Sequence, residues 1–117
     1  MKDYKKLIVW QKGHDNAKLV YDLTKRFPKE ERYGITSQIR RAVVSVPTNI
    51  AEGCGKFTQR DFARYLQIAF GSAQETEYLS LLSYELRYLE EEQYLKTNSL
   101  TNEVKAMLIS LLKKVRT

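Results

Sequence analysis

The stretch SQIRRAVVSVPTNIAEGCG, residues 37–55, carries the pattern that decides the fold. Apolar residues recur at spacings of three and four through this stretch, a period typical of one face of an α-helix. Pro47 falls inside the pattern, where it removes a backbone donor and costs roughly 3 kcal/mol in a regular helix. The sequence therefore predicts a helix over about residues 35–54 that contains an internal proline. Its apolar face comprises Ile35, Ile39, Ala42, Val43, Val46 and Ile50.

A second face of the same predicted helix is polar throughout. It carries amides, a hydroxyl and one charge of each sign, a set typical of side chains that satisfy one another. We predict a buried structural network in which Arg41 pairs with Glu75 or Glu52. Asn49 is expected to satisfy the backbone group that Pro47 leaves free. The alternative is a binding surface on this helix. The predicted network comprises Gln38, Arg41, Ser45, Asn49, Glu52 and Glu75.

The same periodicity predicts three further helices. Pro28 ends the first, because the residue before a proline avoids helical geometry. Gly53 and Gly55 are expected to end the second helix in the left-handed conformation. Thr58 caps the third, and the run TNSLT at residues 97–101 is a candidate interruption of the fourth. These three helices are expected at about residues 7–27, 59–89 and 91–116.

Length and composition limit the class of protein. A chain of 117 residues is long enough for one core, so we expect a single domain over residues 1–117. No apolar run is long enough for a bilayer span or a signal peptide, which predicts a cytoplasmic protein without membrane contact. One cysteine, Cys54, excludes a disulfide framework. Four helices joined by short loops predict an all-α, up-down-up-down antiparallel four-helix bundle.

The net charge of +6 is uneven along the chain. Residues 1–60 hold 13 lysine and arginine residues against 6 acidic ones. A basic surface favours RNA or DNA through counterion release, and solubility alone is the alternative interpretation. No helix-turn-helix pattern is present, so contacts would be made to the phosphate backbone. The candidate nucleic-acid-binding residues are Lys5, Lys6, Lys12, Lys18, Lys25, Arg26, Arg32, Arg40, Lys56 and Arg60.

Catalytic and metal sites lack support in the sequence. His14 is the only histidine, and no nucleophile or acid marks a partner for it. The Glu-x-x-His spacing of di-iron bundles is absent, so no metal and no cofactor is expected. Cys54 lies between glycines at a helix end, with nothing nearby to activate its thiol. Tyr33, Tyr88 and Tyr94 either stack on bases or, as we favour, pack at bundle edges.

Four segments of the sequence resemble a known family. They are VWQKGH at 9–14, FPKEERYG at 27–34, SQIRRAVVSVPTNIAEG at 37–53 and GSAQETE at 71–77. Together they resemble the four-helix-bundle proteins encoded in intervening sequences of bacterial 23S rRNA genes. Gly13 departs from the alanine common in that family, and Cys54 from a common aromatic residue. Neither departure affects the expected fold.

The resemblance implies an assembly and partners. The family is similar to the accessory variability protein of diversity-generating retroelements, a basic pentamer that associates with a reverse transcriptase and with nucleic acid. A homopentameric ring is therefore implied for this chain. We expect a non-enzymatic, oligomeric accessory or scaffold protein that associates with RNA or DNA. The alternative is a protein–protein interaction scaffold in which positive charge serves only solubility.

Overall fold

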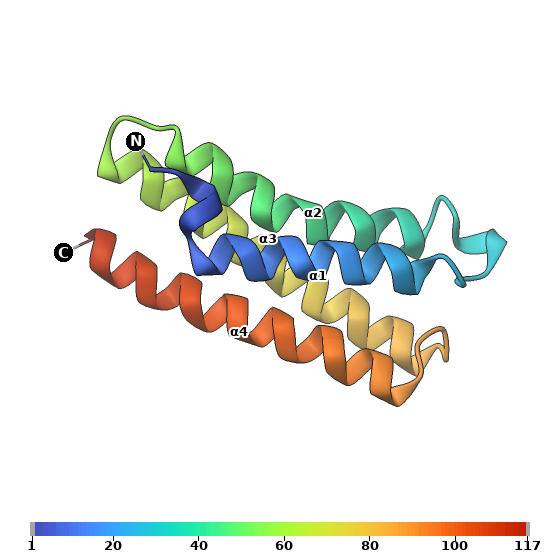
Figure 1. The fold of residues 1–117 in the computed structure, drawn as a ribbon. Coiled ribbons are helices and arrows are strands. Elements are labelled where there is room, and N and C mark those ends of the chain that lie inside the picture. Colours follow the sequence, from blue (N-terminus) through green and yellow to red (C-terminus); the bar gives the residue numbers. More distant parts are fainter. Residues whose placement is uncertain (1, 117) are drawn as a thin grey trace.

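The computed structural model describes residues 2–116, and four long helices account for most of them. Successive helices run in opposite directions, so the chain runs along the bundle axis alternately up and down, once in each helix (Figure 1). A short 3-10 turn, η1 (Tyr4–Lys6), precedes the first helix, and a second, η2 (Lys29–Glu31), lies between the first two. The helices are α1 (Ile8–Thr24), α2 (Ile35–Cys54), α3 (Gln59–Glu85) and α4 (Glu91–Arg116).

Each helix packs against two neighbours. Helix α1 lies beside α2 and α4, and α3 lies beside α2 and α4, whereas the backbones of the diagonal pairs do not come close within the described residues. A square arrangement of this kind lets one stripe from every helix face a shared centre. The predicted all-α four-helix fold is confirmed, and the described part of the chain contains no strand.

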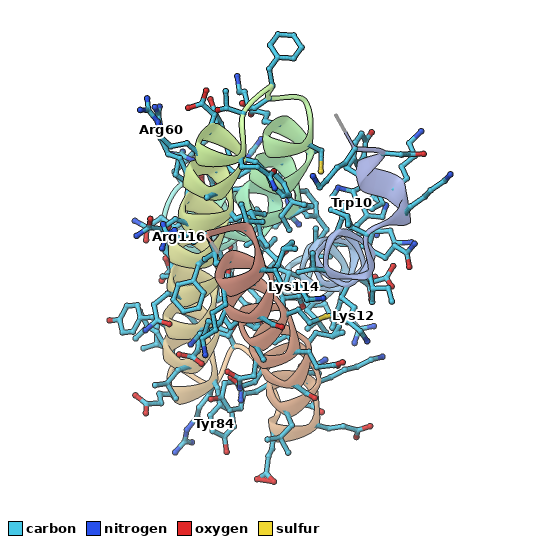
Figure 2. The ribbon with its side chains drawn as sticks, turned by 90° about the vertical axis from the view of Figure 1, so that its left-hand side faces the viewer. Trp10, Lys12, Arg60, Tyr84, Lys114 and Arg116 are labelled. Atoms are coloured by element: carbon cyan, nitrogen blue, oxygen red, sulfur yellow. The ribbon has the colours of Figure 1, made fainter. Side chains whose placement is uncertain are left out.

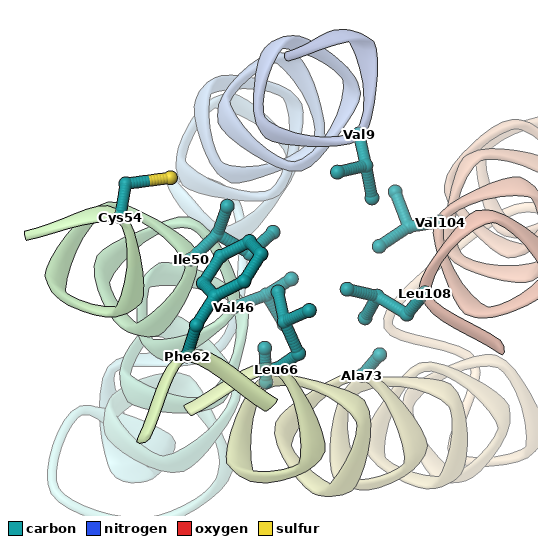
Figure 3. Close-up of a cluster of buried hydrophobic side chains, with 10 residues drawn as sticks. Val9, Val46, Ile50, Cys54, Phe62, Leu66, Ala73, Val104 and Leu108 are labelled. Carbon is teal, nitrogen blue, oxygen red and sulfur yellow. The ribbon is translucent and has the colours of Figure 1, made fainter. Parts of the chain in front are cut away.

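The core consists of two apolar clusters stacked along the bundle axis. The cluster in Figure 3 takes side chains from all four helices, including Val9, Ile50, Leu66 and Leu108. The second cluster includes Ile39, and it lies toward the other end of the bundle. All six residues of the predicted apolar face of α2 are buried, and they are divided between the two clusters.

A buried polar link joins α1 to α4. The Asn16 amide nitrogen donates to Thr101 Oγ1 at 3.0 Å, and Thr97 Oγ1 donates to Asn16 Oδ1 at 2.8 Å. Thr101 Oγ1 donates in turn to the Thr97 carbonyl oxygen at 2.8 Å. The candidate interruption at 97–101 is therefore wrong: α4 runs through these residues, because their hydroxyl groups are satisfied by α1 and by the helix itself.

Two helices end earlier than the sequence predicts. Helix α1 ends at Thr24 rather than near Phe27, and the Phe27 ring packs instead against Tyr88, with ring centroids 5.4 Å apart. Helix α3 ends at Glu85 rather than near residue 89. Arg87 has a φ of 68°, a left-handed conformation that turns the chain toward α4. Buried apolar residues follow the end of each of these helices, at Phe27 and at Leu89. Their spacing from the preceding apolar residues is also compatible with a longer helix, so the sequence pattern alone does not locate the helix end.

Gly53 serves a close helix contact rather than a left-handed turn. The predicted left-handed ends at Gly53 and Gly55 are wrong, since no glycine of the described residues has a positive φ. A Cβ atom on Gly53 would lie 2.9 Å from the Cβ atom of Tyr65, so this glycine lets α2 approach α3. A Cβ atom on Gly13 would lie 3.4 Å from Val46 Cγ1 and 3.6 Å from Cδ of the buried Pro47, so this position has room for a methyl group.

Candidate nucleic-acid interface

Three segments that are distant in sequence meet at one end of the bundle (Figure 1). They are the chain before α1, the connection between α2 and α3, and the last turns of α4. The Lys2 backbone N–H donates to the Cys54 carbonyl oxygen at 3.1 Å, which ties the first segment to the second. Arg116 Nη2 donates to Gln67 Oε1 at 2.8 Å, which ties α4 to α3. The basic end is defined as residues 2–7, 52–64 and 113–116.

Positive charge is concentrated at the basic end. It holds nine lysine and arginine residues against three carboxylates, an excess of six positive charges. The net charge of the whole chain is +6, so the rest of the molecule is neutral overall. The opposite end, residues 22–33 and 85–92, holds five basic residues against seven acidic ones. The charge is therefore separated along the 43 Å long axis of the bundle.

An arginine groove runs between α3 and α4 at the basic end. It has a volume of about 440 Å³ and is lined by Arg60, Arg64, Gln67, Val115 and Arg116, among others. Figure 2 shows Arg60 and Arg116 on the same side of the bundle. No carboxylate of the described residues lies within 4 Å of the Arg60 or Arg64 guanidinium group. Guanidinium groups without an ion pair can bind phosphate oxygens in a bidentate manner.

A second hollow lies beside the α2–α3 connection. It has a volume of about 50 Å³, and Lys2, Lys56 and Phe57 are among the residues that line it. Lys2 Nζ lies 4.6 Å from the centre of the Phe62 ring, and Lys56 Nζ lies 4.9 Å from that of Tyr65. Cation–π contacts with these two rings hold both ammonium groups near the connection. The two hollows together give the basic end five cationic side chains that line concave surface.

The structure divides the basic residues that the sequence nominated. Lys5, Lys6, Lys56 and Arg60 lie at the basic end. Arg26 and Arg32 lie at the opposite end, about as far from it as the bundle allows (Figure 1). They do not share one surface with the first four residues.

The remaining four nominated residues have partners within the chain. Lys12 Nζ lies 2.9 Å from Glu103 Oε2, while Lys18 and Lys25 lie 3.8 and 3.9 Å from aspartates one turn away on α1. Arg40 is half-buried, and its guanidinium group donates to Thr24 Oγ1 at 2.8 Å. These contacts occupy part of their hydrogen-bonding capacity.

Sequence reasoning missed the members of the basic end that lie late in the chain. Arg64, Lys113, Lys114 and Arg116 belong to it, yet the second half of the sequence is nearly neutral. These residues can be identified only from the order and direction of the helices. In an up-down-up-down bundle the start of α3 and the end of α4 lie at the same end, so their charges combine (Figure 1).

The predicted polar network forms only in part. Asn49 Nδ2 donates to the carbonyl oxygen of Ser45 at 2.8 Å and to its Oγ at 2.9 Å, and Ser72 Oγ donates to Ser45 Oγ at 2.8 Å. Asn49 thus bonds Ser45, and not the Val43 carbonyl oxygen that Pro47 deprives of a donor. These small polar groups link α2 to α3.

The remaining members of that network, Gln38 and the three charged residues, lie on the surface of the single chain. Gln38, Arg41, Glu52 and Glu75 are exposed, and Arg41 has no carboxylate of residues 2–116 within ion-pairing distance. The expected burial of an Arg41 ion pair is therefore wrong for the single chain. The residue lies on the outer side of the α2–α3 contact, where its long side chain reaches water.

An open groove runs along the outer side of the contact between α1 and α2. Its volume is about 540 Å³, and its lining includes Trp10, His14, Tyr21, Val44 and Pro47. The Trp10 and His14 rings are stacked, with centroids 4.8 Å apart. His14 is exposed, and no group of three metal-binding side chains occurs in residues 2–116. The groove is thus aromatic and apolar in character.

Cys54 and two of the tyrosines pack against other side chains of the bundle. Cys54 is buried, and burial raises the pKa of its thiol. Tyr88 Oη donates to Glu31 Oε2 at 2.9 Å, and this hydrogen bond raises the pKa of Tyr88. The Tyr94 ring stacks on Tyr84 with centroids 4.8 Å apart. Tyr88 and Tyr94 therefore have the packing role that we favoured.

The fold and the comparisons with known proteins agree on the class. Four antiparallel helices around one shared centre place the chain among the small four-helix-bundle proteins. The family model for 23S rRNA-intervening sequence protein matches residues 5–110, and the chain belongs to this family. The resemblance found in the sequence is thereby confirmed. Within residues 2–116, no helix combines the length and the apolar character needed to cross a bilayer.

A solved structure supports the same assignment. The crystal structure of a protein with unknown function from the S23 ribosomal protein family of Bacteroides thetaiotaomicron is similar to this chain, with 31% sequence identity and a TM-score of 0.85. The match covers 91% of this chain and 99% of that chain. A search of the curated proteins finds no match.

Proposed function

We propose that this protein is a non-enzymatic accessory or scaffold protein that binds RNA or DNA through its basic end. The observation that carries the proposal is the concentration of six excess positive charges at one end, where the arginine groove opens. Binding there would release condensed counterions from the nucleic acid, a contribution that does not depend on sequence. The proposed contacts go to phosphate groups, so we expect weak preference among sequences.

A salt titration with matched variants tests this proposal. The double variant Arg60→Gln/Arg64→Gln removes two charges from the arginine groove. The control, Arg26→Gln/Arg32→Gln, removes two exposed arginines from the opposite end. We expect the groove variant to bind a labelled RNA or DNA strand about tenfold more weakly at about 50 mM salt. Its logarithmic salt slope should fall by about 0.7 for each phosphate group of the strand that is no longer neutralised.

The control variant is expected to bind as the unchanged protein does. Fluorescence anisotropy between about 50 and 200 mM salt measures both quantities. If the two double variants lose affinity for the strand to the same extent, binding depends on the net charge of the protein and not on the basic end. Absence of binding by the unchanged protein at the lowest salt would reject the proposed function altogether.

The oligomeric part of the proposal is supported by apolar residues left exposed on the single chain. Val44, Ile68, Tyr78 and Leu81 of α2 and α3 are each between 37% and 60% exposed. Large apolar side chains at these positions favour burial against a further surface. We propose that this surface is a second copy of the chain, in keeping with the homopentamer that the family resemblance implies.

The α1–α2 groove favours a second candidate function. Its aromatic lining and open shape suit a helix of a partner protein laid between α1 and α2. In that case the protein would be an interaction scaffold without nucleic acid, and the positive charge would serve solubility. The salt titration distinguishes the two, because a pure scaffold shows no affinity for RNA or DNA even at low salt.

A further inference from the structure

Phe57 is the most exposed of the large apolar residues, with 91% of its surface accessible. It lies at the tip of the α2–α3 connection, within the basic end. A ring of this size that is open to water is available for stacking, because burying it against a ligand is favourable. The other residues of the connection, such as Lys56 and Thr58, are polar or charged.

The backbone on both sides of Phe57 is held in place. The Gly55 N–H donates to the Glu52 carbonyl oxygen at 3.0 Å, and the Lys56 N–H donates to that of Gly53 at 3.1 Å. On the other side, the Asp61 N–H donates to Thr58 Oγ1 at 3.1 Å and closes the start of α3. The ring therefore projects from a fixed position, and stacking on it requires little additional ordering of the backbone.

Cationic residues share the basic end with Phe57. Phe57, Lys2 and Lys56 are among the residues that line the hollow of about 50 Å³. Arg60 lies in the first turn of α3 and opens into the arginine groove. An exposed aromatic ring at the same end of the bundle as ammonium and guanidinium groups matches the two parts of a nucleotide, an unpaired base and its phosphate.

We infer that the basic end recognises single-stranded nucleic acid, with an unpaired base stacked on Phe57 and the adjoining phosphates at Lys2, Lys56 and Arg60. This inference rests on the proposed function, which places nucleic acid at the basic end. In a duplex the faces of the bases are covered by their neighbours, so Phe57 has no base to stack on. The ring therefore adds a preference for single strands to an electrostatic attraction that both forms share.

A membrane surface is a poorer occupant for the same residues. An interfacial segment binds lipid with an extended apolar face and cations beside it. Phe57 is the only large apolar side chain in the connection at residues 55–58, and one ring gives little apolar area to bury. Stacking on a base, by contrast, needs a single exposed ring.

Substitution of Phe57 tests the inference. The variants Phe57→Leu and Phe57→Trp remove and retain an aromatic ring, and Tyr33→Leu removes an aromatic ring that is 86% exposed at the opposite end. Each is titrated at one salt concentration with a labelled single strand of about 20 nucleotides and with the duplex of the same length. We expect Phe57→Leu to weaken single-strand binding by about 5- to 150-fold, and to leave duplex binding within about twofold of the unchanged protein.

Phe57→Trp is expected to restore single-strand binding, and Tyr33→Leu to change neither affinity. If the unchanged protein binds both forms and Phe57→Leu weakens both or neither, the inference is overturned while the proposed function stands. If the unchanged protein binds neither form, both fail. Loss of binding to phosphatidylserine vesicles in Phe57→Leu, with unchanged binding to the single strand, would assign the ring to lipid and would also overturn the inference.

Discussion

Gly13 and Gly53 both lie at helix contacts, but they differ in the space available for a side chain. A Cβ atom on Gly13 would meet its nearest neighbour, Val46 Cγ1, at 3.4 Å, which is van der Waals contact. A Cβ atom on Gly53 would meet Tyr65 Cβ at 2.9 Å and Phe62 Cδ1 at 3.2 Å, which requires α2 and α3 to separate. Both glycines lie in helical backbone, where alanine is the better residue when space permits.

The two alanine substitutions are therefore expected to have opposite effects. Gly13→Ala should raise the free energy of unfolding by about 0.5–1 kcal/mol, because alanine restricts the unfolded chain and favours the helix. Gly53→Ala should lower it by about 1–3 kcal/mol through overpacking. Urea denaturation followed by circular dichroism measures both, and each variant serves as the control for the other. A gain of stability in Gly53→Ala would contradict the close α2–α3 contact.

The sequence pattern predicts which face of α2 is buried, but it does not predict the partners of the polar side chains of α2. The spacing of Ile39, Val43, Val46 and Ile50 predicts burial, because an apolar stripe has only one favourable place in a bundle. The partner of Arg41 depends on how far α2 rotates and slides against α3. That geometry is set by packing at Gly53 and by small hydroxyl groups, and periodicity contains no information about it.

At the scale of elements, the link between α1 and α4 decides their register. Asn16, Thr97 and Thr101 are the polar groups through which these two helices meet in the core. Apolar contacts permit some sliding, whereas a hydrogen bond requires defined atoms to lie opposite each other. The run of polar residues at 97–101 predicts a break when the sequence is considered alone, since its partner lies 81 to 85 residues away.

Removing one partner of this link should destabilise the bundle. Asn16→Ala leaves the Thr97 hydroxyl without its acceptor, and we expect a loss of about 1–3 kcal/mol in the free energy of unfolding. Asn102→Ala, at an exposed position of α4, is the control and should change it by less than about 0.5 kcal/mol. Replacing all three polar residues together, with Asn16→Leu, Thr97→Val and Thr101→Val, should recover part of the loss. Thermal and urea unfolding measure the free energy of unfolding of each variant and so test the expected order of their stabilities.

At the scale of the whole molecule, Arg41 and Glu75 are oppositely charged, exposed and unpaired with each other. They lie on α2 and α3, the two helices that also expose Val44 and Tyr78. Charges of both signs beside apolar side chains are suited to an interface between copies, where each charge finds a partner on the neighbour. The ion pair of Arg41 is thus expected at the contact between chains and not in the core of one chain.

If the proposed assembly of copies forms through this surface, Arg41→Ala is expected to shift it toward smaller species. Light scattering after size exclusion should show a lower molar mass at equal protein concentration, because the partner charge is left unpaired in the interface. Circular dichroism of the separated chain should remain unchanged, since Arg41 is exposed there. Lys96→Ala, on the exposed face of α4, is the control. An unchanged molar mass in Arg41→Ala would remove this residue from the proposed interface.

The distribution of charge shows what the sequence could and could not reveal at this scale. Counting along the chain assigns the excess to residues 1–60 and therefore to the first two helices. Folding redistributes it, because antiparallel helices place Lys2, Lys56 and Arg116 at one end (Figure 1). The number of charges followed from composition, but their arrangement required the order and direction of the helices.

The position of the chain ends bears on how this protein should be handled at the bench. Lys2 and Arg116 both belong to the basic end, so a purification tag fused at either terminus would stand beside the surface proposed to bind nucleic acid. Attachment through a Tyr33→Cys thiol at the opposite end avoids this obstruction. Cys54 is buried and burial raises its pKa, so a maleimide should react first with the introduced thiol. Immobilised in this way, the molecule would present its basic end to solution.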